Sequence, residues 1–336
     1  MDLLFLGSSS FSIPFINALH ESSHRLLAVI TRPDRPSGRG LEVRPSAVKK
    51  FCQEKGISLL QPSSVNEKNF LGYLVSLRPD LLVVVAYGEI LRPPLLAIPP
   101  RGSVNVHASL LPKYRGPSPI ETAIMEGEAR TGITTMLITP ALDEGDIFLQ
   151  REVEILSHET AGDLYEKLMQ IGPPLLLETV EGIAQGTLVP VPQDHSQATY
   201  TAKITPQMAN IDWQQEARRI HDLIRALNPR PGARTALRGN IIKIWGSQVI
   251  GQDKYATKGP AEPGSVVGTS SPEGLIVATG EDFLRITELQ PVGRKRMRGE
   301  DFIRGYHVQV GDRFEKTPLK LDMPVVKDLC YPPREK

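Results

Sequence analysis

The chain has 336 residues, of which 23% are charged and 40% hydrophobic, and its formal net charge is +1. This length favours about two domains in a globular protein. No apolar run reaches the roughly 18 residues of a membrane span, and the apolar N-terminal stretch lacks the basic flank and cleavage site of a signal peptide, so we expect a cytoplasmic protein. The only cysteines, Cys52 and Cys330, lie far apart in the sequence, which argues against a disulfide framework and a four-cysteine zinc site.

The first half of the chain alternates strand-like and helix-like segments. Nearly continuous runs of aliphatic residues are typical of buried strands, and they occupy residues 3–6, 26–31, 81–86, 103–106 and 133–139. Residues 45–55 and 70–77 have helical patterns that end at Gly56 and before Pro79. This alternation predicts an α/β fold with a doubly wound, mostly parallel sheet. The turn at residues 7–10 lacks the spacing of a glycine-rich phosphate loop, so we expect no nucleotide cofactor.

A linker is expected after the middle of the chain. Following a strand near residues 146–155, Thr160 and Asp163 have the spacing of a capping box, which predicts a helix that ends near Gly172. Residues 173–186 suit a further helix. The next segment is rich in Pro, Gln, Ser and Thr, so it resembles a domain linker.

The second half predicts a smaller, all-β domain. After a helix around residues 214–227, short strands separated by Gly, Pro and Asp indicate a small β-barrel, and they include residues 241–245, 274–278 and 283–289. The proline-rich C-terminus indicates an extended tail. The expected organisation is a first domain, a linker, a second domain and the tail, at residues 1–188, 189–206, 207–315 and 316–336.

Positive charge is concentrated toward the C-terminus. Residues 206–336 contain 21 Lys or Arg against 16 Asp or Glu, whereas residues 1–205 contain 18 against 22. A basic end suggests a polyanionic partner such as nucleic acid, although the same excess fits a solvated surface. The densest clusters contain Arg35 and Arg39 in one loop and Arg294, Lys295 and Arg296 in another. Such arginines can bind phosphates; a solvated loop and a charged hairpin turn are the alternatives.

Candidate catalytic residues follow two of the predicted strands. Asn105 and His107 are two positions apart on an extended strand, so they point the same way and can donate hydrogen bonds to one oxyanion. Asp143 follows the strand at residues 133–139, and ligands bind at the carboxyl ends of parallel strands. A carboxylate beside His107 would fix the tautomer of the ring. Glu144 and Asp146 are rival carboxylates, and their spacing does not distinguish them from Asp143.

Each of these residues also has a structural interpretation. A His after a strand is more often structural, a buried Asn can anchor a loop, and Asp143 lies in a turn sequence. The apolar loop at residues 110–117 can form a pocket wall or pack on its own domain, and residues 83–88 can form a second wall or simply end a strand.

Taken together, these motifs resemble the methionyl-tRNA formyltransferases, a family among the enzymes that use 10-formyltetrahydrofolate. The matching stretches lie within residues 1–310, at residues 31–40, 83–88, 105–112, 142–146, 193–203 and 289–295. The Asn, His, Ser-Leu-Leu-Pro and Asp set specifies formyl transfer, whereas the loop at 31–40 and the C-terminal part specify a tRNA acceptor. The chain departs from the family at Ser8-Ser9, where Thr-Pro is usual, and at Leu41-Glu42, where a lysine pair is common.

The resemblance implies a Rossmann-like formyltransferase domain and an OB-like barrel that helps to bind tRNA. It assigns catalysis to Asn105, His107 and Asp143. Folate contacts are expected from Ser109, Leu110, Leu111 and Pro112, with Tyr87 and Gly88 at the second wall. Arg39 falls in the loop that the family inserts at the acceptor end of the tRNA, and Arg35, Arg294, Lys295 and Arg296 complete the expected tRNA-binding set.

The implied reaction formylates methionyl initiator tRNA for translation initiation, without a metal or a membrane, in a monomer. Three other functions remain as alternatives. One is formyl transfer to a nucleotide sugar or to glycinamide ribonucleotide, one is nucleic-acid binding without catalysis, and one is a nicotinamide dehydrogenase.

Overall fold

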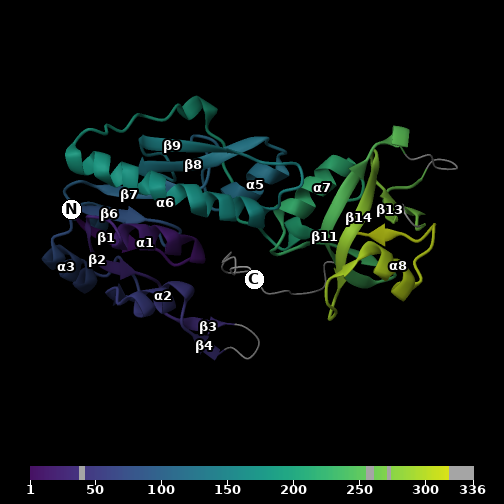
Figure 1. Ribbon diagram of the computed structural model, residues 1–336, viewed down its shortest axis with the longest axis horizontal. Helices are drawn as coiled ribbons and strands as arrows, with labels where there is room; N and C mark the ends of the chain where they lie inside the picture. The colour runs from purple at the N-terminus through teal and green to yellow at the C-terminus, as the bar shows by residue number, and fades with distance from the viewer. Residues whose placement is uncertain (38–41, 255–260, 271–273, 318–336) are drawn as a thin grey trace.

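A seven-stranded sheet organises the N-terminal part of the computed structural model, which describes residues 1–37, 42–254, 261–270 and 274–317 (Figure 1). The strand order is β5-β2-β1-β6-β7-β8-β9. The strands are β1 (Asp2–Leu6), β2 (Arg25–Ile30), β5 (Leu59–Leu60), β6 (Leu81–Val84), β7 (Ser103–His107), β8 (Arg130–Leu137) and β9 (Ile147–Glu154). The neighbours from β5 to β7 pair in parallel, as the alternating pattern predicts.

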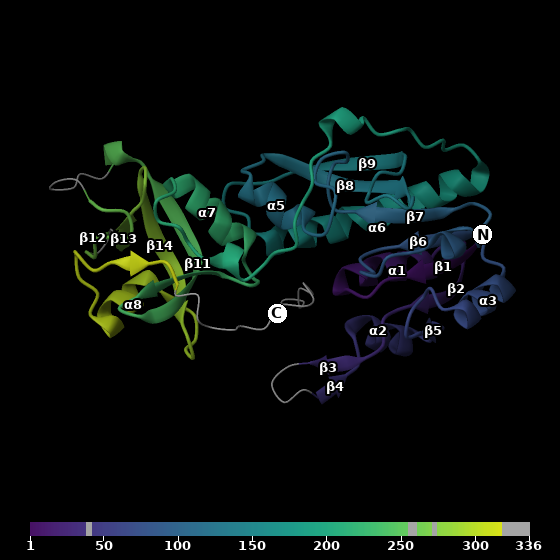
Figure 2. The ribbon, with the colours of Figure 1, turned by 180° about the vertical axis from the view of Figure 1, so that it is seen from behind.

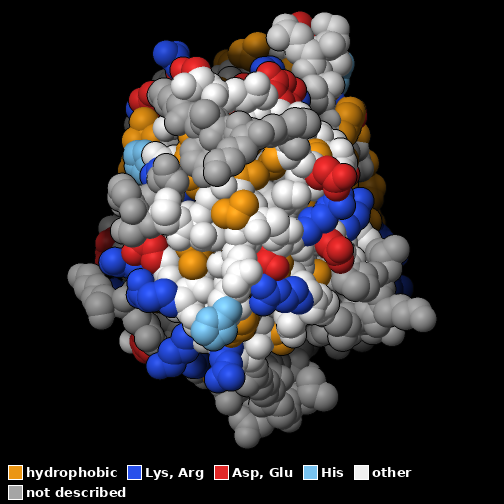
Figure 3. Space-filling model, turned by 90° about the vertical axis from the view of Figure 1, so that its right-hand side faces the viewer, with side chains coloured by type: hydrophobic (Ala, Val, Ile, Leu, Met, Phe, Trp, Pro, Cys, Tyr) orange, Lys and Arg blue, Asp and Glu red, His pale blue; other side chains and the backbone are white. Residues whose placement is uncertain are grey.

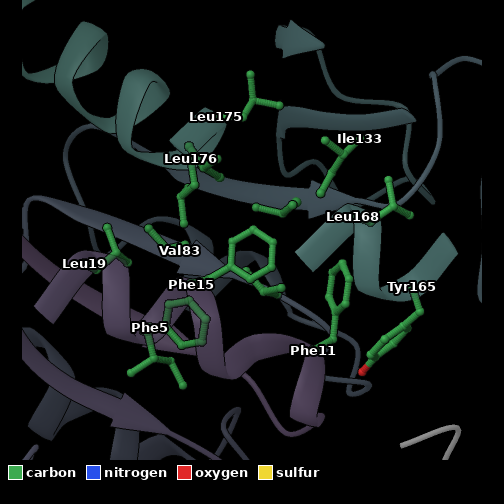
Figure 4. Close-up of a cluster of buried hydrophobic side chains, with 14 of the residues drawn as sticks. Phe5, Phe11, Phe15, Leu19, Val83, Ile133, Tyr165, Leu168, Leu175 and Leu176 are labelled. Carbon is green, nitrogen blue, oxygen red and sulfur yellow. The ribbon is translucent and has the colours of Figure 1, made fainter. Parts of the chain in front are cut away.

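Helices cover both faces of this sheet, which is why its central strands are almost wholly apolar. Alternate residues of β1 enter different cores: Leu3 and Phe5 pack with helices α1 (Ile13–His20) and α6 (Ala161–Gln185), whereas Leu4 and Leu6 pack with α3 (Lys68–Leu77) and α4 (Pro93–Leu96). Figure 4 shows the first of these cores, in which Phe5, Phe11 and Phe15 lie against side chains of α6. The sheet is therefore doubly wound.

The direction of β8 differs from expectation. β8 pairs antiparallel with β7, with His107 opposite Thr134 and Val104 opposite Leu137, and β9 pairs antiparallel with β8. The carboxyl end of β8 therefore lies beside the start of β7, so the prediction that β8 runs parallel to β7 is wrong. Asp143 nevertheless lies near His107, because the connection between β8 and β9 returns to it. An apolar run reports burial and carries no information about strand direction.

Helix α6 is continuous, whereas the sequence pattern predicts two helices that meet near Gly172. Thr160 and Asp163 form the expected capping box at its start. Pro173 and Pro174 lie inside the helix, where proline normally removes a hydrogen bond and favours a break. Leu168 before the prolines and Leu176 after them are buried in the same core, so packing holds the helix together across them.

The C-terminal part is an antiparallel sheet that curls into a half-barrel, as expected for a small β-domain (Figure 2). Its strand order is β12-β13-β14-β11-β10-β16, and β15 pairs with β14. A bridge between Ser265 and Arg313 joins the segments at its two ends. The strands are β10 (Ala233–Leu237), β11 (Asn240–Ile250), β12 (Val266–Gly268), β13 (Leu275–Ala278), β14 (Phe283–Pro291), β15 (Met297–Arg298) and β16 (Phe314–Glu315).

Helix α7 (Ala217–Ala226) links the two sheets. It contributes Ile220 and Ile224 to the C-terminal core, and it packs against α5 (Pro119–Met125) of the N-terminal part. Arg225 donates hydrogen bonds to the backbone oxygens of Leu156 and Glu159, which precede α6. In both views α5 and α7 lie side by side between the sheets (Figures 1 and 2).

The remaining elements are short. A hairpin of β3 (Arg35–Ser37) and β4 (Glu42–Arg44) precedes α2 (Ala47–Lys55), and α8 (Gly299–Tyr306) packs on the C-terminal sheet. Single 3-10 turns occupy Ser10–Ser12, His195–Gln197, Gln207–Ala209 and Gln252–Lys254. Among the described residues, no helix is both long enough and apolar enough to cross a membrane.

Candidate active site

A cavity of about 1230 Å³ lies where the two parts of the chain face each other. The N-terminal wall contains Asn105 and His107 of β7, together with residues 138–143 from the connection between β8 and β9. The opposite wall contains four cations, which are Lys203, Arg230, Arg234 and Lys243. Within the described ranges, no group of three or more His, Cys, Asp or Glu side chains is arranged to hold a metal ion.

His107 ends β7 and is buried, with 6% of its surface exposed. Its Nε2 donates to the backbone oxygen of Tyr114 at 2.9 Å, and its Nδ1 lies 3.6 Å from Oδ2 of Asp143. The second distance is longer than a hydrogen bond, although catalytic contacts often tighten only when substrate binds. The structure therefore brings His107 and Asp143 together and gives each ring nitrogen an oxygen neighbour.

Asp143 is the carboxylate that faces His107. Its Oδ2 accepts a hydrogen bond from the backbone N–H of Gly116 at 2.8 Å, and its backbone has a left-handed φ of 51°. This conformation is uncommon for non-glycine residues, and Asp is among the few that tolerate it. The rival Glu144 instead forms an ion pair with Arg115, with Oε1 3.2 Å from Nη1.

Asn105 lies in the middle of β7 and lines the same cavity as His107 and Asp143. Within the described part of the chain, no hydrogen bond fixes its side-chain amide, so the loop-anchoring interpretation finds no partner. Its N–H groups are available to an oxygen atom that enters the cavity.

The expected folate-contacting residues fall into two groups. Tyr87 and Gly88 line the cavity, whereas Ser109, Leu110, Leu111 and Pro112 are not among its lining residues. The hydroxyl of Ser109 donates to the backbone oxygen of Lys113, and the backbone N–H of Leu111 donates to Thr134. The segment thus packs on its own part of the chain. Burial raises the pKa of Tyr87, which keeps its hydroxyl neutral.

The expected tRNA-binding residues are placed only in part. Arg39 lies outside the described residues, as do Leu41 and the tail after residue 317, and only the backbone of Arg35 is described, in β3. Arg294 and Lys295 are exposed in the turn after β14. Arg296 is exposed as well, but its guanidinium carbon lies 3.8 Å from the centre of the Trp245 ring, and partial desolvation lowers its pKa. Figure 3 shows this end of the molecule, where Lys and Arg side chains gather toward the lower edge.

The basic wall of the cavity contains residues that no sequence motif predicted. Lys243 donates to the backbone oxygen of Pro231 at 2.7 Å, and burial together with Arg234 and Arg296 lowers its pKa. In the sheet, Lys243 lies opposite Arg234 on β10 and Gln290 on β14. The register between β10 and β11 places Arg234 and Lys243 side by side. No local sequence pattern predicts this pairing.

Comparison with known proteins identifies the family. The formyl transferase model matches residues 1–180, and the model for the C-terminal domain of formyl transferases matches residues 203–307. Methionyl-tRNA formyltransferases of Bacillus velezensis and Bacillus subtilis are each 43% identical to the chain over 311 residues, which is 92% of this chain and 96% of the relative. The protein belongs to the methionyl-tRNA formyltransferase family.

Members of this family are formyl-transferring enzymes, so the chain is an enzyme and its resemblance to the family is confirmed. The methionyl-tRNA formyltransferase of Alkaliphilus oremlandii is 40% identical over 93% of this chain and 99% of its own length. More distant solved structures share the fold. WlaRD, a sugar 3N-formyltransferase crystallised with 5-N-formyl-THF, has a TM-score of 0.63 at 18% identity and covers 88% of this chain and 99% of its own.

Proposed function

We propose that this protein transfers the formyl group of 10-formyltetrahydrofolate to the α-amine of methionine on initiator tRNA, with Asn105, His107 and Asp143 as its catalytic residues. The observation that carries the proposal is the convergence of these three side chains on one cavity in a member of the methionyl-tRNA formyltransferase family. The product, N-formylmethionyl-tRNA, serves translation initiation.

The reaction requires an oxyanion site and a proton path. The amine attacks the formyl carbon, a C–N bond forms, and the carbonyl oxygen becomes an oxyanion in the tetrahedral intermediate. Asn105 and His107 donate to this oxygen, which for His107 means exchanging its contact with Tyr114. Asp143 holds His107 and helps to move the proton from the amine to N10, whose bond to the formyl carbon then breaks.

The two walls of the cavity suit the two substrates. Apolar side chains beside Tyr87 and Gly88 suit the ring system of a folate, and they belong to Ile90, Leu91, Ile138 and Leu142. The basic wall suits the phosphates at the 3′ end of a tRNA, since cations there neutralise backbone charge. Arg35, Arg39, Arg294, Lys295 and Arg296 extend the proposed tRNA contacts. Ser109, Leu110, Leu111 and Pro112 remain proposed folate contacts by resemblance to the family, although they do not line the cavity.

We propose the domain boundaries that the sequence predicts, and the separate buried clusters on the two sheets support this division. We assign residues 1–188 to the formyltransferase domain, 189–206 to the linker and 207–315 to the tRNA-binding domain, with a tail at 316–336. We expect a cytoplasmic protein, since both proposed substrates are soluble, and we propose that it acts as a monomer.

A direct assay tests the function. Purified protein is mixed with 10-formyltetrahydrofolate and with methionyl initiator or methionyl elongator tRNA, and formylmethionine is measured after hydrolysis of the ester. Formylation of the initiator tRNA in preference to the elongator tRNA is expected. Equal transfer to both tRNAs would contradict the proposed preference for initiator tRNA. Transfer only to a nucleotide-linked amino sugar would mean that the acceptor is this sugar and not a tRNA.

A further inference from the structure

Arg115 is the largest side chain that is fully buried in the described structure, with 0% of its surface exposed. Its Nε and Nη2 donate to Oε1 of Gln193 at 3.2 and 2.8 Å, and its Nη1 lies 3.2 Å from Oε1 of Glu144. Further contacts reach Nδ1 of His195 and the hydroxyl of Tyr200. A buried guanidinium is tolerated only when its charge and its donors are matched in this way.

Gln193 carries this arrangement to the loop that contains Asp143. Its Nε2 donates to the backbone oxygen of Asp143 at 2.9 Å and to that of Gly145 at 2.7 Å. With Oε1 occupied by Arg115, the amide of Gln193 is satisfied on both sides, and its orientation is therefore set by Arg115. The Gln193 side chain thus bridges the Arg115 guanidinium and the backbone oxygens on both sides of Glu144.

The backbone next to Arg115 holds the side chains of the catalytic pair. Tyr114 accepts from Nε2 of His107 through its backbone oxygen, and Gly116 donates to Oδ2 of Asp143 through its backbone N–H. The backbone of Arg115 itself is tied to residues 199–201 by hydrogen bonds with Thr199 and Thr201. Residues 114–116 thus contact both His107 and Asp143. Residues 193–201 in turn hold residues 114–116 in place through hydrogen bonds.

We propose that Arg115 and Gln193 are positioning residues that hold Asp143 against His107 in its left-handed conformation. The inference rests on the proposed roles of Asp143 and His107. It also gives part of the expected linker, residues 193–201, a function in catalysis besides joining the two domains. Neither Arg115 nor Gln193 lines the cavity, so both act through the residues that they hold.

Two conservative variants test the proposal in the full-length chain. Gln193→Glu keeps an oxygen for Arg115 but removes the donor to Asp143 and Gly145. Arg115→Lys keeps the charge beside Glu144 but cannot donate from two nitrogens to one amide oxygen. We expect kcat for formylation of methionyl initiator tRNA to fall by about 100-fold in each, because small misplacement of a catalytic group has effects of this size.

The separation of KM from kcat distinguishes positioning from general damage. The concentration of folded sites is measured by binding of 5-formyltetrahydrofolate, and KM values for both substrates should stay within about threefold of wild type. The double variant should lose no more than the worse single variant, since both act through one contact. Arg225→Lys is the matched control, because Arg225 is also buried and hydrogen-bonded but lies outside the cavity. It should lower stability and leave kcat per folded site unchanged.

The outcomes separate this inference from the function on which it rests. Wild-type kcat in Gln193→Glu, or losses that multiply in the double variant, would overturn the positioning role while leaving formyl transfer intact. If Arg115→Lys does not fold, Gln193→Glu alone decides. If Asp143→Asn instead retains full activity, the assignment of the catalytic pair is at fault.

Discussion

Each ring nitrogen of His107 has an oxygen neighbour, whereas the side-chain amide of Asn105 has no hydrogen-bond partner in the described part of the chain. Because Nε2 donates to Tyr114 and Nδ1 faces Asp143, the ring is oriented before substrate arrives. The amide of Asn105 has no such partner among the described residues. At the scale of single residues, Asn105 is therefore the donor most directly available to an oxyanion.

This availability leads to a prediction for Asn105. Asn105→Ala should lower kcat for formylation by about 100- to 1000-fold, as loss of one oxyanion donor does, with little change in tRNA affinity. Asn105→Asp, which keeps the shape and brings a negative charge to the oxyanion, should be at least as damaging. Single-turnover rates and a tRNA binding isotherm measure the two effects. A rate within a few fold of wild type would remove Asn105 from the mechanism. Asn240→Ala, at the exposed start of β11, serves as the control.

Helix α6 shows what a sequence pattern reveals about an element and what it does not. The capping box at Thr160 and Asp163 is local and was predicted from four residues. The predicted helix end near Gly172 is wrong. The helix continues through Pro173 and Pro174 because its buried face packs in the core on both sides of them. Gly172 is needed for close packing instead: a Cβ there would lie 2.7 Å from Cδ1 of Ile133 and would overlap Phe15.

The packing role of Gly172 predicts the effect of a methyl group. Gly172→Ala should destabilise the protein by about 1–3 kcal/mol, because an added methyl overpacks a filled core. Gly72→Ala is the matched control: Gly72 lies inside α3, a Cβ there would meet nothing within 4 Å, and the change should stabilise by up to about 1 kcal/mol through helix propensity. Urea unfolding of both variants measures the difference. If Gly172→Ala stabilises as well, Gly172 is only a weak helix former at that position.

The two parts of the molecule are joined through α7, and His221 lies at this junction. Its Nδ1 contacts Ser247 of β11 at 2.9 Å, and its Nε2 donates to the backbone oxygen of Ser157 at 3.1 Å. Burial lowers the pKa of His221 below its usual 6.5, despite the opposing effects of Ser157 and Asp222. The folded protein therefore favours the neutral form of the His221 imidazole.

The lowered pKa gives the whole molecule a pH-dependent stability. As pH falls through about 6.5, the unfolded chain takes up a proton at His221 that the folded chain does not, so the free energy of unfolding should fall. His24, whose pKa burial also lowers, contributes in the same direction. Urea titrations at pH 7.5 and 5.5 measure this loss. His221→Gln keeps polar contacts without a titrating ring and should show a smaller loss; an unchanged loss would place its origin elsewhere.

The sequence alone determined the features that depend on neighbours along the chain. Alternation of strands and helices predicted the doubly wound sheet, and four residues predicted the start of α6. The motif around Asn105, His107 and Asp143 predicted formyl transfer, whereas residues 31–40 and the C-terminal part indicated the tRNA branch of the family. Tertiary structure decided which residues meet across the chain. It turned β8 antiparallel, kept α6 whole, placed Lys243 beside Arg234, and buried Arg115 against Gln193, 78 positions away. Local patterns report burial and periodicity, whereas strand direction, register and charge pairing depend on contacts between segments that are distant in sequence.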